Sequence, residues 1–277
     1  MASITLRPIG GLCNRMFAIS SAYALAVNTG RDLTVLWELD QGLNAPFEFL
    51  FQPIPGITVF SRKKYLNVFT NQFRKLSPQL FRRYMEKKYG TLFTRSDMED
   101  LRKKDVNRPK MVLEGLIDQD LYVEYYYHFF QNNFLPLLFK PVLQIQNRIE
   151  QVVGSFSAET IGIQIRRTDH VHAIQNSPIQ LFTEKMDRDI LQNDNVSYFL
   201  ATDSTEVVTF LQKKYSNRII NATHNRSRNS KEGVKQAVVD LFCLSRTSRI
   251  YGSYGSTFSD AAHLIGNIPI EILKLNI

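Results

Sequence analysis

The stretch Glu159–His170 reads E-T-I-G-I-Q-I-R-R-T-D-H, and its character changes sharply in the middle. The first part, Thr160–Ile165, is short and rich in β-branched residues, which is typical of a strand buried in an α/β sheet. The second part, Arg166–Asp169, is entirely polar. In open α/β sheets, ligands bind at the carboxyl ends of the strands. These four polar residues therefore mark a candidate binding site.

Arg166 and Arg167 place two positive charges side by side. Such charges repel each other and cannot both be buried without partners. An anionic ligand would relieve this repulsion, because a guanidinium group matches two phosphate oxygens at once. The pair could instead lie on the surface, with Asp169 as a local ion-pair partner. The stretch alone leaves both interpretations open.

The second half of the chain alternates strand-like and helix-like segments, which predicts a parallel sheet with right-handed crossovers. Polar residues follow the strands at Arg166–Asp169, Asp203–Ser204 and Gly252–Ser256, so we expect all three groups at one edge of the sheet. The expected strands are Thr160–Arg166, Tyr198–Thr202, Arg218–Ala222, Arg249–Gly252 and Ile268–Leu273, and the expected helices are about Ile179–Leu191, Thr205–Tyr215, Glu232–Arg246 and Thr257–Gly266.

The amino-terminal forty residues predict a βαβ unit. A strand at Ile4–Ile9 leads through Gly10-Gly11 into a helix from about Asn14 to Asn28, which Gly30 ends as a C-cap. A second strand follows at Leu33–Trp37. Paired glycines let the backbone approach a ligand, and the first turn of a helix presents free N–H groups to an anion. The same glycine pair could instead form a tight turn between strand and helix that binds no ligand.

The middle of the chain is harder to organise. We expect a helix over Leu66–Tyr89 with a break at Pro78, a strand at Lys110–Leu116 and a helix at Val142–Val153. The aromatic residues between Tyr122 and Phe130 are interpreted mainly as core packing. The length of 277 residues suits two domains, which we expect to span 1–145 and 146–277.

The composition, 44% hydrophobic and 22% charged residues, is that of an ordinary globular protein. No apolar run approaches the roughly 18 to 20 residues of a transmembrane helix, and the amino terminus leads directly into a strand rather than a signal peptide. The two cysteines, Cys13 and Cys243, are too few for a disulfide framework or a four-cysteine zinc site. We therefore expect a cytoplasmic protein.

The net charge of +8 suits nucleic acid, anionic lipid or a phosphorylated ligand. Much of the surplus lies in residues 62–110, where lysines and arginines alternate with aromatic and aliphatic residues. A basic amphipathic segment of this kind is more often a solvated surface, which is the interpretation we favour. It would also suit a polyanion, or peripheral contact with the inner membrane surface.

Four motifs follow one another in the second half: I-Q-I-R-R-T-D, Y-F-L-A-T-D-S, H-N-R…G-V-K-Q-A-V-V-D-L-F-C-L-S and Y-G-S-Y-G-S-T-F-S-D-A-A. In this order they closely resemble the motifs of the α1,6-fucosyltransferases and the rhizobial nodulation fucosyltransferase, within the GDP-fucose transferase superfamily. The opening G-G-L-C-N-R-M-F is similar to the superfamily's G-G-L-G-N-Q-M-F, which is strongest in the α1,2 group. The likeness covers residues 160–265 well and 9–30 moderately.

The resemblance implies an α/β protein of GT-B type, with two Rossmann-like domains facing each other across a cleft. Residues 1–145 would form the acceptor-side domain and 146–277 the nucleotide-sugar-binding domain. It also implies an inverting, metal-independent glycosyltransferase with no cofactor. GDP-fucose would be the donor, and an oligosaccharide or lipid-linked glycan the acceptor.

The resemblance also implies which residues bind the phosphates. Arg166 would clamp the β-phosphate and Arg167 would support it. Ser256 and Thr257 would bind diphosphate oxygens at the start of the last helix, a position that independently suits an anion.

Five further positions follow from the same resemblance. Asp203 and Asp240 would face the guanosine, where carboxylates accept hydrogen bonds from guanine N–H groups or ribose hydroxyls. The Gly10–Gly11 turn and Asn14 would approach the diphosphate from the other domain.

The sequence departs from the family pattern where a catalytic base is needed. Gln164 stands where the first motif begins with His, and His170 stands where the family has Lys. The segment Val171–Gln175 contains no carboxylate, although a downstream Glu has been the proposed acceptor base in the family. Asp169 is our first candidate for the base, with His170 and His172 behind it.

Two other functions compete. A metal-dependent GT-A-type glycosyltransferase would use a D-x-D site, and Asp118-Gln119-Asp120 after the expected strand fits that string. Asp187-Arg188-Asp189 fits too, but i and i+2 diverge on a helix. A non-catalytic basic protein that binds nucleotides or nucleic acid would explain the charge. That charge lies mostly outside the motif-bearing half, and no nucleic-acid-binding signature is evident, so we expect no nucleic-acid partner.

Overall fold

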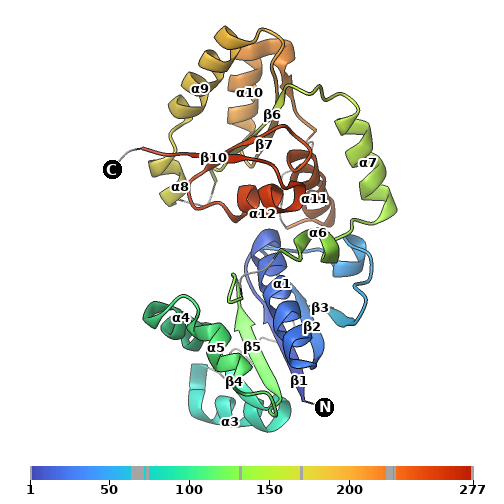
Figure 1. Cartoon of the computed structure of the whole chain (residues 1–277), viewed down its shortest axis with the longest axis vertical. Coiled ribbons are helices and arrows are strands. Elements are labelled where there is room, and N and C mark those ends of the chain that lie inside the picture. Colours follow the sequence, from blue (N-terminus) through green and yellow to red (C-terminus); the bar gives the residue numbers. More distant parts are fainter. Residues whose placement is uncertain are drawn as a thin grey trace. The chain divides into compact units, whose positions relative to one another are not determined.

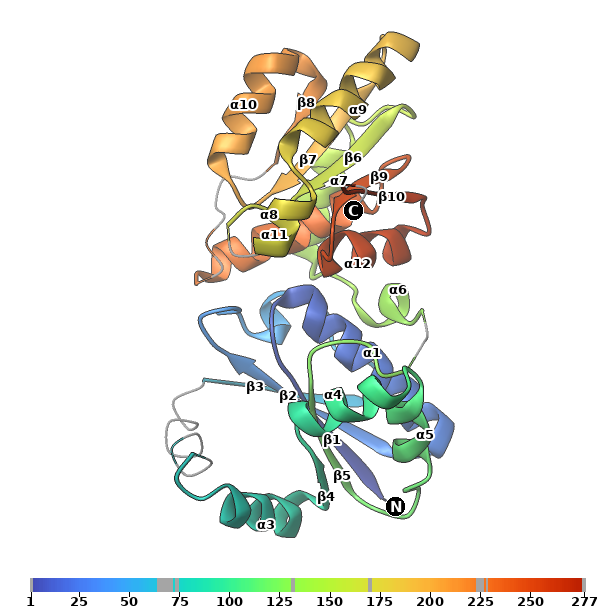
Figure 2. The ribbon, with the colours of Figure 1, turned by 90° about the vertical axis from the view of Figure 1, so that its left-hand side faces the viewer.

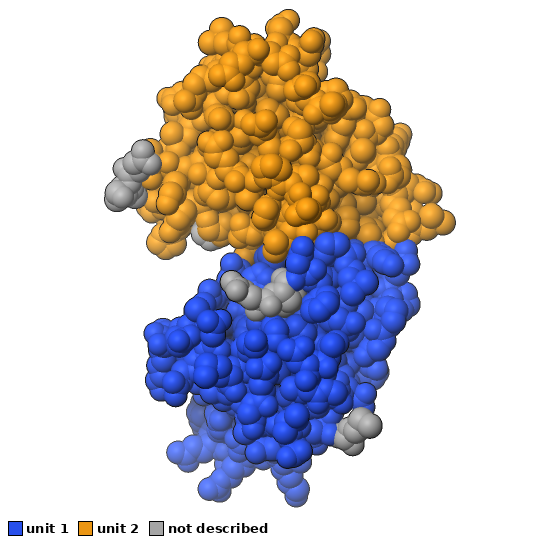
Figure 3. Space-filling model, in the orientation of Figure 1, with its two compact units in different colours: residues 1–140, 228–231 blue, residues 141–227, 232–277 orange. Residues whose placement is uncertain are grey.

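The computed structural model in Figure 1 describes residues 2–63, 72, 75–130, 133–168, 171–222, 227 and 229–275. The chain divides into two compact units, coloured separately in Figure 3. Unit 1 comprises residues 1–140 and 228–231, and unit 2 comprises residues 141–227 and 232–277. None of the helices in the described ranges combines the length and apolar character that crossing a membrane requires.

Unit 1 is built on a parallel sheet of five strands in the order β3-β2-β1-β5-β4. The strands are β1 Ser3–Pro8, β2 Asp32–Leu39, β3 Ile57–Lys63, β4 Thr91–Phe93 and β5 Leu121–Tyr125; the helices are α1 Leu12–Thr29, α3 Pro78–Tyr89, α4 Arg95–Lys104, α5 Arg108–Glu114 and α6 Leu135–Leu138, with a 3₁₀ turn at Phe47–Phe49.

The expected βαβ unit is confirmed: β1 leads through the glycine turn into α1, and β2 returns parallel to β1. Helix α1 begins at Leu12, two residues earlier than expected. It ends at Gly30, which has φ 63° and donates its N–H to Ala26. Met16 and Phe17 are completely buried, so the helix is fixed to the sheet by its apolar side.

The region after β3 follows the sequence-based expectations only in part. Helix α3 begins at Pro78 and ends at Tyr89, as the proline break predicts. Residues 66–71 and 73–74 of the expected helix lie outside the described residues. The strand expected at Lys110–Leu116 is wrong, because Arg108–Glu114 forms helix α5. The apolar run Met111–Leu113 is too short to show a period, and Pro109 suits the first turn of a helix.

Unit 2 contains a second parallel sheet, in the order β10-β9-β6-β7-β8, and its alternation of strands and helices was predicted. The strands are β6 Thr160–Ile165, β7 Ser197–Thr202, β8 Ile219–Ile220, β9 Ile250–Ser253 and β10 Ile270–Leu273; the helices are α7 Leu143–Val153, α8 Val171–Asn176, α9 Ile179–Gln192, α10 Thr205–Tyr215, α11 Lys231–Leu244 and α12 Thr257–Gly266, with a 3₁₀ turn at Ser216–Arg218.

The two faces of the unit 2 sheet are packed differently. Ile161, Ile163 and Ile165 point toward α9 and α10 and belong to the main apolar cluster of this unit. Gly162 points the other way, where a Cβ atom would lie 2.6 Å from both Leu244 Cδ1 and Thr247 Oγ1. A side chain there would clash, so this glycine permits the close packing of α11 and its following turn against β6.

A row of alternating charges crosses four strands of the unit 1 sheet. Arg62 on β3 pairs with Glu38 on β2 at 2.7 Å; Glu38 pairs with Arg7 on β1 at 2.7 Å; and Arg7 pairs with Glu124 on β5 at 2.6 Å. Glu38 and Glu124 are buried. Burial alone lowers the pKa of Arg7, but the charges of Glu124 and Glu38 outweigh it and raise that pKa. The four side chains neutralise one another inside the fold.

The aromatic segment after β5 is mainly core, as expected. Tyr125 and Phe129 are buried, and the main chain of this segment is tied to α1, where Ser21 Oγ accepts the N–H of Phe129 at 3.3 Å. The His128 ring packs on Phe17, with 4.1 Å between centroids. Burial, and then the charge of Arg102, lowers the pKa of His128 to about 4. The imidazole is therefore neutral near pH 7.

Replacing His128 with Phe should make unit 1 more resistant to acid. Because the pKa of His128 is about 4 in the folded protein and about 6.5 in the unfolded chain, protonation favours unfolding as the pH falls between these values. Between pH 7 and pH 4.5 the free energy of unfolding of the wild type should fall by roughly 2 to 3 kcal/mol because of this histidine. The His128→Phe variant should not show this loss. Urea unfolding at pH 7 and at pH 4.5 measures the difference. An equal loss in both proteins would contradict the expectation.

Candidate functional site

The order β9-β6-β7 brings the three predicted polar segments together at the carboxyl edge of the unit 2 sheet. The backbone N–H of Arg166, after β6, donates to Ser253 Oγ at the end of β9 at 3.1 Å. The backbone N–H of Arg167 donates to Asp203 Oδ1, after β7, at 2.8 Å. The expectation of one common edge is confirmed.

Asp203 holds the double-arginine loop. Besides the N–H of Arg167, its carboxylate accepts the Thr168 hydroxyl on Oδ2 at 2.8 Å. Nε of Arg166 lies 3.2 Å from Oδ2, within ion-pair distance although the N–H is not aligned as a hydrogen bond. The side chains of Arg166 and Asp203 are 22% and 15% exposed, so the charges are only partly screened by water.

Arg167 turns back into the protein. Its Nη1 donates to the carbonyl of Arg166 and its Nη2 to the carbonyl of Ser177, both at 2.8 Å. Burial lowers the pKa of Arg167, and the charge of Asp203 opposes this shift. These contacts brace the loop from the inside.

Ser177 was not predicted as a site residue, yet it joins three segments. It is completely buried, donates its hydroxyl to the carbonyl of Leu273 at 2.5 Å and accepts the N–H of Tyr254 at 2.9 Å. Its only sequence signal is the Ser-Pro pair before α9, which is typical of a helix start. The contacts to Leu273 and Tyr254 are too distant in sequence to be predicted.

The start of α12 borders the same edge. Ser256 is the N-cap residue, is 8% exposed and donates its backbone N–H to the carbonyl of Ser253 at 3.3 Å. Its side chain makes no capping hydrogen bond. Thr257 is the first residue of the helix, and the first-turn N–H groups of any helix have no intrahelical acceptors. This end of α12 therefore suits an anion.

Asp240 and Gln164 lie deeper in unit 2. Asp240, on α11, is 5% exposed and accepts a hydrogen bond from Gln236 Nε2 at 3.0 Å. Burial, and then the charge of Asp240, raises the pKa of the Cys243 thiol. Gln164, where the resembling family has His, is buried in β6 and accepts the N–H of Ser253 on Oε1 at 3.4 Å. It therefore joins β6 to β9.

Of the three candidate bases, the structure describes only His172. Asp169 and His170 lie outside the described residues. His172 is exposed on the short helix α8, where its carbonyl accepts a hydrogen bond from Asn176 Nδ2 at 2.8 Å.

The glycine turn of unit 1 has the conformation that its sequence predicts. Gly10 has φ +88°, and Gly11 is the N-cap of α1 with extended backbone. A Cβ atom on Gly10 would lie 2.8 Å from Asn14 Nδ2, so Asn14 packs directly against the turn. Gly10, Gly11 and Asn14 are thus adjacent, at the carboxyl end of β1.

Arg15 fixes this turn from inside and was not predicted. Its side chain is completely buried; Nε donates to the carbonyl of Gly10 at 2.8 Å, Nη1 donates to the carbonyl of Glu38, and Nη2 contacts Asp40 Oδ2 at 3.0 Å. The guanidinium also lies over the Trp37 ring, 5.1 Å from its centroid. One cation therefore connects the turns that follow β1 and β2.

The structure rules against the D-x-D alternative. Asp118 and Asp120 do not follow a strand; they precede β5, at its amino end, and Asp120 Oδ1 accepts the backbone N–H of Ser3 at 2.7 Å. Asp187 on α9 is bound to Lys214 and Tyr215 at 2.7 Å each. In the part of the chain that the structure describes, no group of three or more His, Cys, Asp or Glu side chains is arranged to hold a metal ion.

Two parallel Rossmann-like sheets, each flanked by helices, define the GT-B type of fold. The NodZ fucosyltransferase from Bradyrhizobium has this fold: its structures are 18% identical over 98% of this chain and about 94% of theirs, with a TM-score of 0.67 for the NodZ α-1,6-fucosyltransferase soaked with GDP-fucose. A FUT1 variant from Arabidopsis thaliana in complex with GDP is also 18% identical, over 97% of this chain and 69% of that one, with a TM-score of 0.61.

A more distant structure extends the same likeness. Apo POFUT1 is 12% identical over 97% of both chains, with a TM-score of 0.56. No protein-family model matches the sequence, and no curated protein matches it significantly. At these identities the likeness establishes the fold, which is the one expected from the sequence.

Replacing Asp203 with Ala should destabilise unit 2. The partly buried N–H of Arg167 and the exposed hydroxyl of Thr168 would lose their charged acceptor, at a cost of about 1 to 3 kcal/mol. Asp194→Ala is the matched control, because Asp194 also follows an element of unit 2 and pairs with Arg218, but its side chain is 88% exposed. The free energy of unfolding of this control variant should fall by no more than about 1 kcal/mol. Urea unfolding measures both, and equal losses would contradict this role for Asp203.

Proposed function

We propose that this chain is a glycosyltransferase that transfers fucose from GDP-fucose to a glycan acceptor. The observation that carries the proposal is the double-arginine loop. Arg166 and Arg167 are held by Asp203 at the carboxyl edge of the unit 2 sheet, where Ser253 links the loop to the start of α12. The same fold occurs in fucosyltransferase structures determined with GDP or GDP-fucose.

The diphosphate of the donor would bind at this edge. Arg166 would clamp the β-phosphate, because a guanidinium fork can bind two phosphate oxygens. Arg167 would support Arg166 from behind, in keeping with its two backbone contacts. Ser256 and Thr257 would bind the remaining oxygens with their hydroxyls and the free N–H groups of α12.

Other residues would hold the rest of the nucleotide. Asp240 would face the guanosine. Asp203 would do so only while also holding the arginine loop, since both of its oxygens already accept hydrogen bonds from that loop. Gly10, Gly11 and Asn14 would approach the diphosphate from an acceptor-side domain, which we propose to span residues 1–145, with residues 146–277 binding the nucleotide sugar.

The proposed reaction is an inverting transfer that uses no metal. The bond between fucose C1 and the β-phosphate oxygen breaks, the acceptor oxygen bonds to C1 from the opposite face, and GDP leaves. Negative charge grows on the departing diphosphate. A fixed guanidinium and helix N–H groups can stabilise that charge without reorganising.

The proton of the acceptor hydroxyl needs a base. Asp169 is our first choice, because it follows the arginine pair directly, and His170 and His172 come next. A carboxylate or a neutral imidazole within hydrogen-bond reach of the hydroxyl can accept the proton as the new bond forms.

The proposed acceptor is an oligosaccharide or a lipid-linked glycan. We place the reaction in the cytoplasm, at the inner membrane surface, with peripheral contact through the basic region 62–110. Cys13 and Cys243 are both buried free thiols, which suits a reducing compartment.

GDP should stabilise the protein more than other nucleotides do. A ligand that binds only the folded state raises its stability by about 2.7 kcal/mol at a hundredfold excess over Kd. Thermal unfolding should therefore shift upward with GDP and GDP-fucose, and less with UDP or ADP. A larger shift with UDP or ADP would contradict the donor assignment, and a similar response to all would favour a general anion site.

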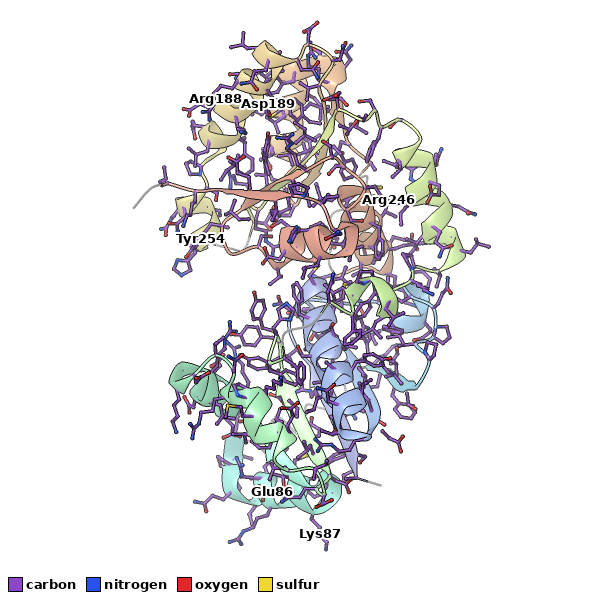
Figure 4. All side chains as sticks on the ribbon, viewed as in Figure 1. Glu86, Lys87, Arg188, Asp189, Arg246 and Tyr254 are labelled. Atoms are coloured by element: carbon purple, nitrogen blue, oxygen red, sulfur yellow. The ribbon has the colours of Figure 1, made fainter. Side chains whose placement is uncertain are left out.

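Arg166→Ala should abolish most transfer while leaving the fold intact. Removing one such charge-stabilising donor costs about 2.7 to 4 kcal/mol in the transition state, or roughly a hundredfold to a thousandfold in kcat. Arg166→Lys should recover only part of this, because an ammonium lacks the planar fork. Arg188→Ala, on the exposed side of α9 (Figure 4), is the control. Transfer of radiolabelled fucose measures all three; near-normal turnover of Arg166→Ala would remove the clamp from the mechanism.

A further inference from the structure

Helix α3 exposes large apolar side chains next to cations. Leu80 is 54% exposed, Tyr84 is 49% exposed, and Leu76, just before the helix, is 85% exposed. The helix is already anchored by another stripe, since Phe81 and Met85 are buried with Leu92 and Tyr122 of the sheet. Leu80 and Tyr84 lie outside this buried stripe.

The cations lie along the same helix. Arg83 is three residues after Leu80, and Lys87 and Lys88 are three and four residues after Tyr84, so they neighbour these side chains on the helix surface. All three are exposed, and Figure 4 shows Lys87 extending outward from α3. Residues 75–110 contain 11 lysines and arginines and 5 acidic residues, so most of the chain's net charge of +8 lies here.

Strand β3 carries another exposed ring, at the opposite edge of the sheet from β4. Phe60 on β3 is 55% exposed and is the register partner of Leu36 on β2. Leu36 packs in the same cluster as Phe81, so Phe60 lies on the sheet face that α3 covers. Figures 1 and 2 show α3 beside β4 and β5 on this face. We call Leu76, Leu80, Arg83, Tyr84, Lys87 and Lys88 the α3 surface.

We propose that the α3 surface binds the headgroup region of an anionic lipid bilayer. A helix lying in that plane presents leucine and aromatic side chains to the acyl boundary, while lysine and arginine stems extend to the phosphates. A nucleic acid would be attracted by the cations, but its phosphates make no use of the aliphatic side chains of Leu76 and Leu80. The inference rests on the peripheral contact through residues 62–110 proposed above and names the residues that make it, but it does not depend on the transfer reaction.

The test is sedimentation of the full chain with vesicles of phosphatidylcholine containing about one quarter phosphatidylglycerol, at about 0.05 M and about 0.5 M salt. The wild type should bind at low salt, bind far less at high salt, and bind weakly to pure phosphatidylcholine. Lys87→Gln/Lys88→Gln should weaken binding by about fivefold for each lysine. Lys103→Gln/Lys104→Gln removes the same charge from α4 and should change binding less than twofold. Equal losses in the two pairs would mean that net charge alone acts, and would overturn the proposal.

A second pair tests the apolar part. Leu80→Ser/Tyr84→Ser should weaken vesicle binding about tenfold or more, because buried apolar area is lost. Val106→Ser/Met111→Ser, at positions 63% and 66% exposed near α5, is the matched control and should have little effect. Circular dichroism melting verifies that each variant is folded. The proposal would be overturned by unchanged binding of Leu80→Ser/Tyr84→Ser, by no vesicle binding of the wild type, or by displacement from vesicles by a stoichiometric oligonucleotide.

Discussion

The double-arginine loop can exist because one carboxylate contacts three consecutive residues. Two adjacent guanidinium groups at the edge of a buried sheet would repel each other and lose hydration. Asp203 accepts hydrogen bonds from the N–H of Arg167 and the hydroxyl of Thr168, and it forms an ion pair with Arg166. The Arg167 side chain turns inward and donates to backbone carbonyls. The positions of Ser253 and α12 beside the loop follow from the strand order, since β9 and β7 are the two neighbours of β6.

Most of the fold of unit 2 could be predicted, because β7, β8 and β9 are each followed by one helix, although the short helix α8 between β6 and α9 was not expected. Helices α10 and α12 have the expected bounds. Unit 1 was harder. Arg108–Glu114 has a short apolar run that fits a strand or a helix equally well, and only its packing beside α4 and α1 selects the helix. That error also made Asp118 and Asp120 look like a site at the end of a strand.

The candidate-site residues that directly follow a strand could be predicted from the sequence. Those that are placed by contacts with residues distant in sequence could not. Arg166, Asp203 and the segment ending in Ser256 could be brought together by topology alone. Arg15 could not, because arginine is rarely buried and its acceptors, the carbonyls of Gly10 and Glu38 and the carboxylate of Asp40, are set by tertiary structure. Ser177 is similar: its acceptor on Leu273 is almost a hundred residues away.

The charge row Arg62–Glu38–Arg7–Glu124 has a consequence for how the first sheet assembles. Successive side chains of a strand point to opposite faces, so a slip of one residue in β2 would move Glu38 to the face that α1 covers with apolar residues. Arg62 would then lose Glu38 as its ion-pair partner, and Arg7 would keep only Glu124. A one-residue slip would therefore cost the ion pairs of Glu38, so the charge row helps to select the register in which β2 pairs with β1 and β3.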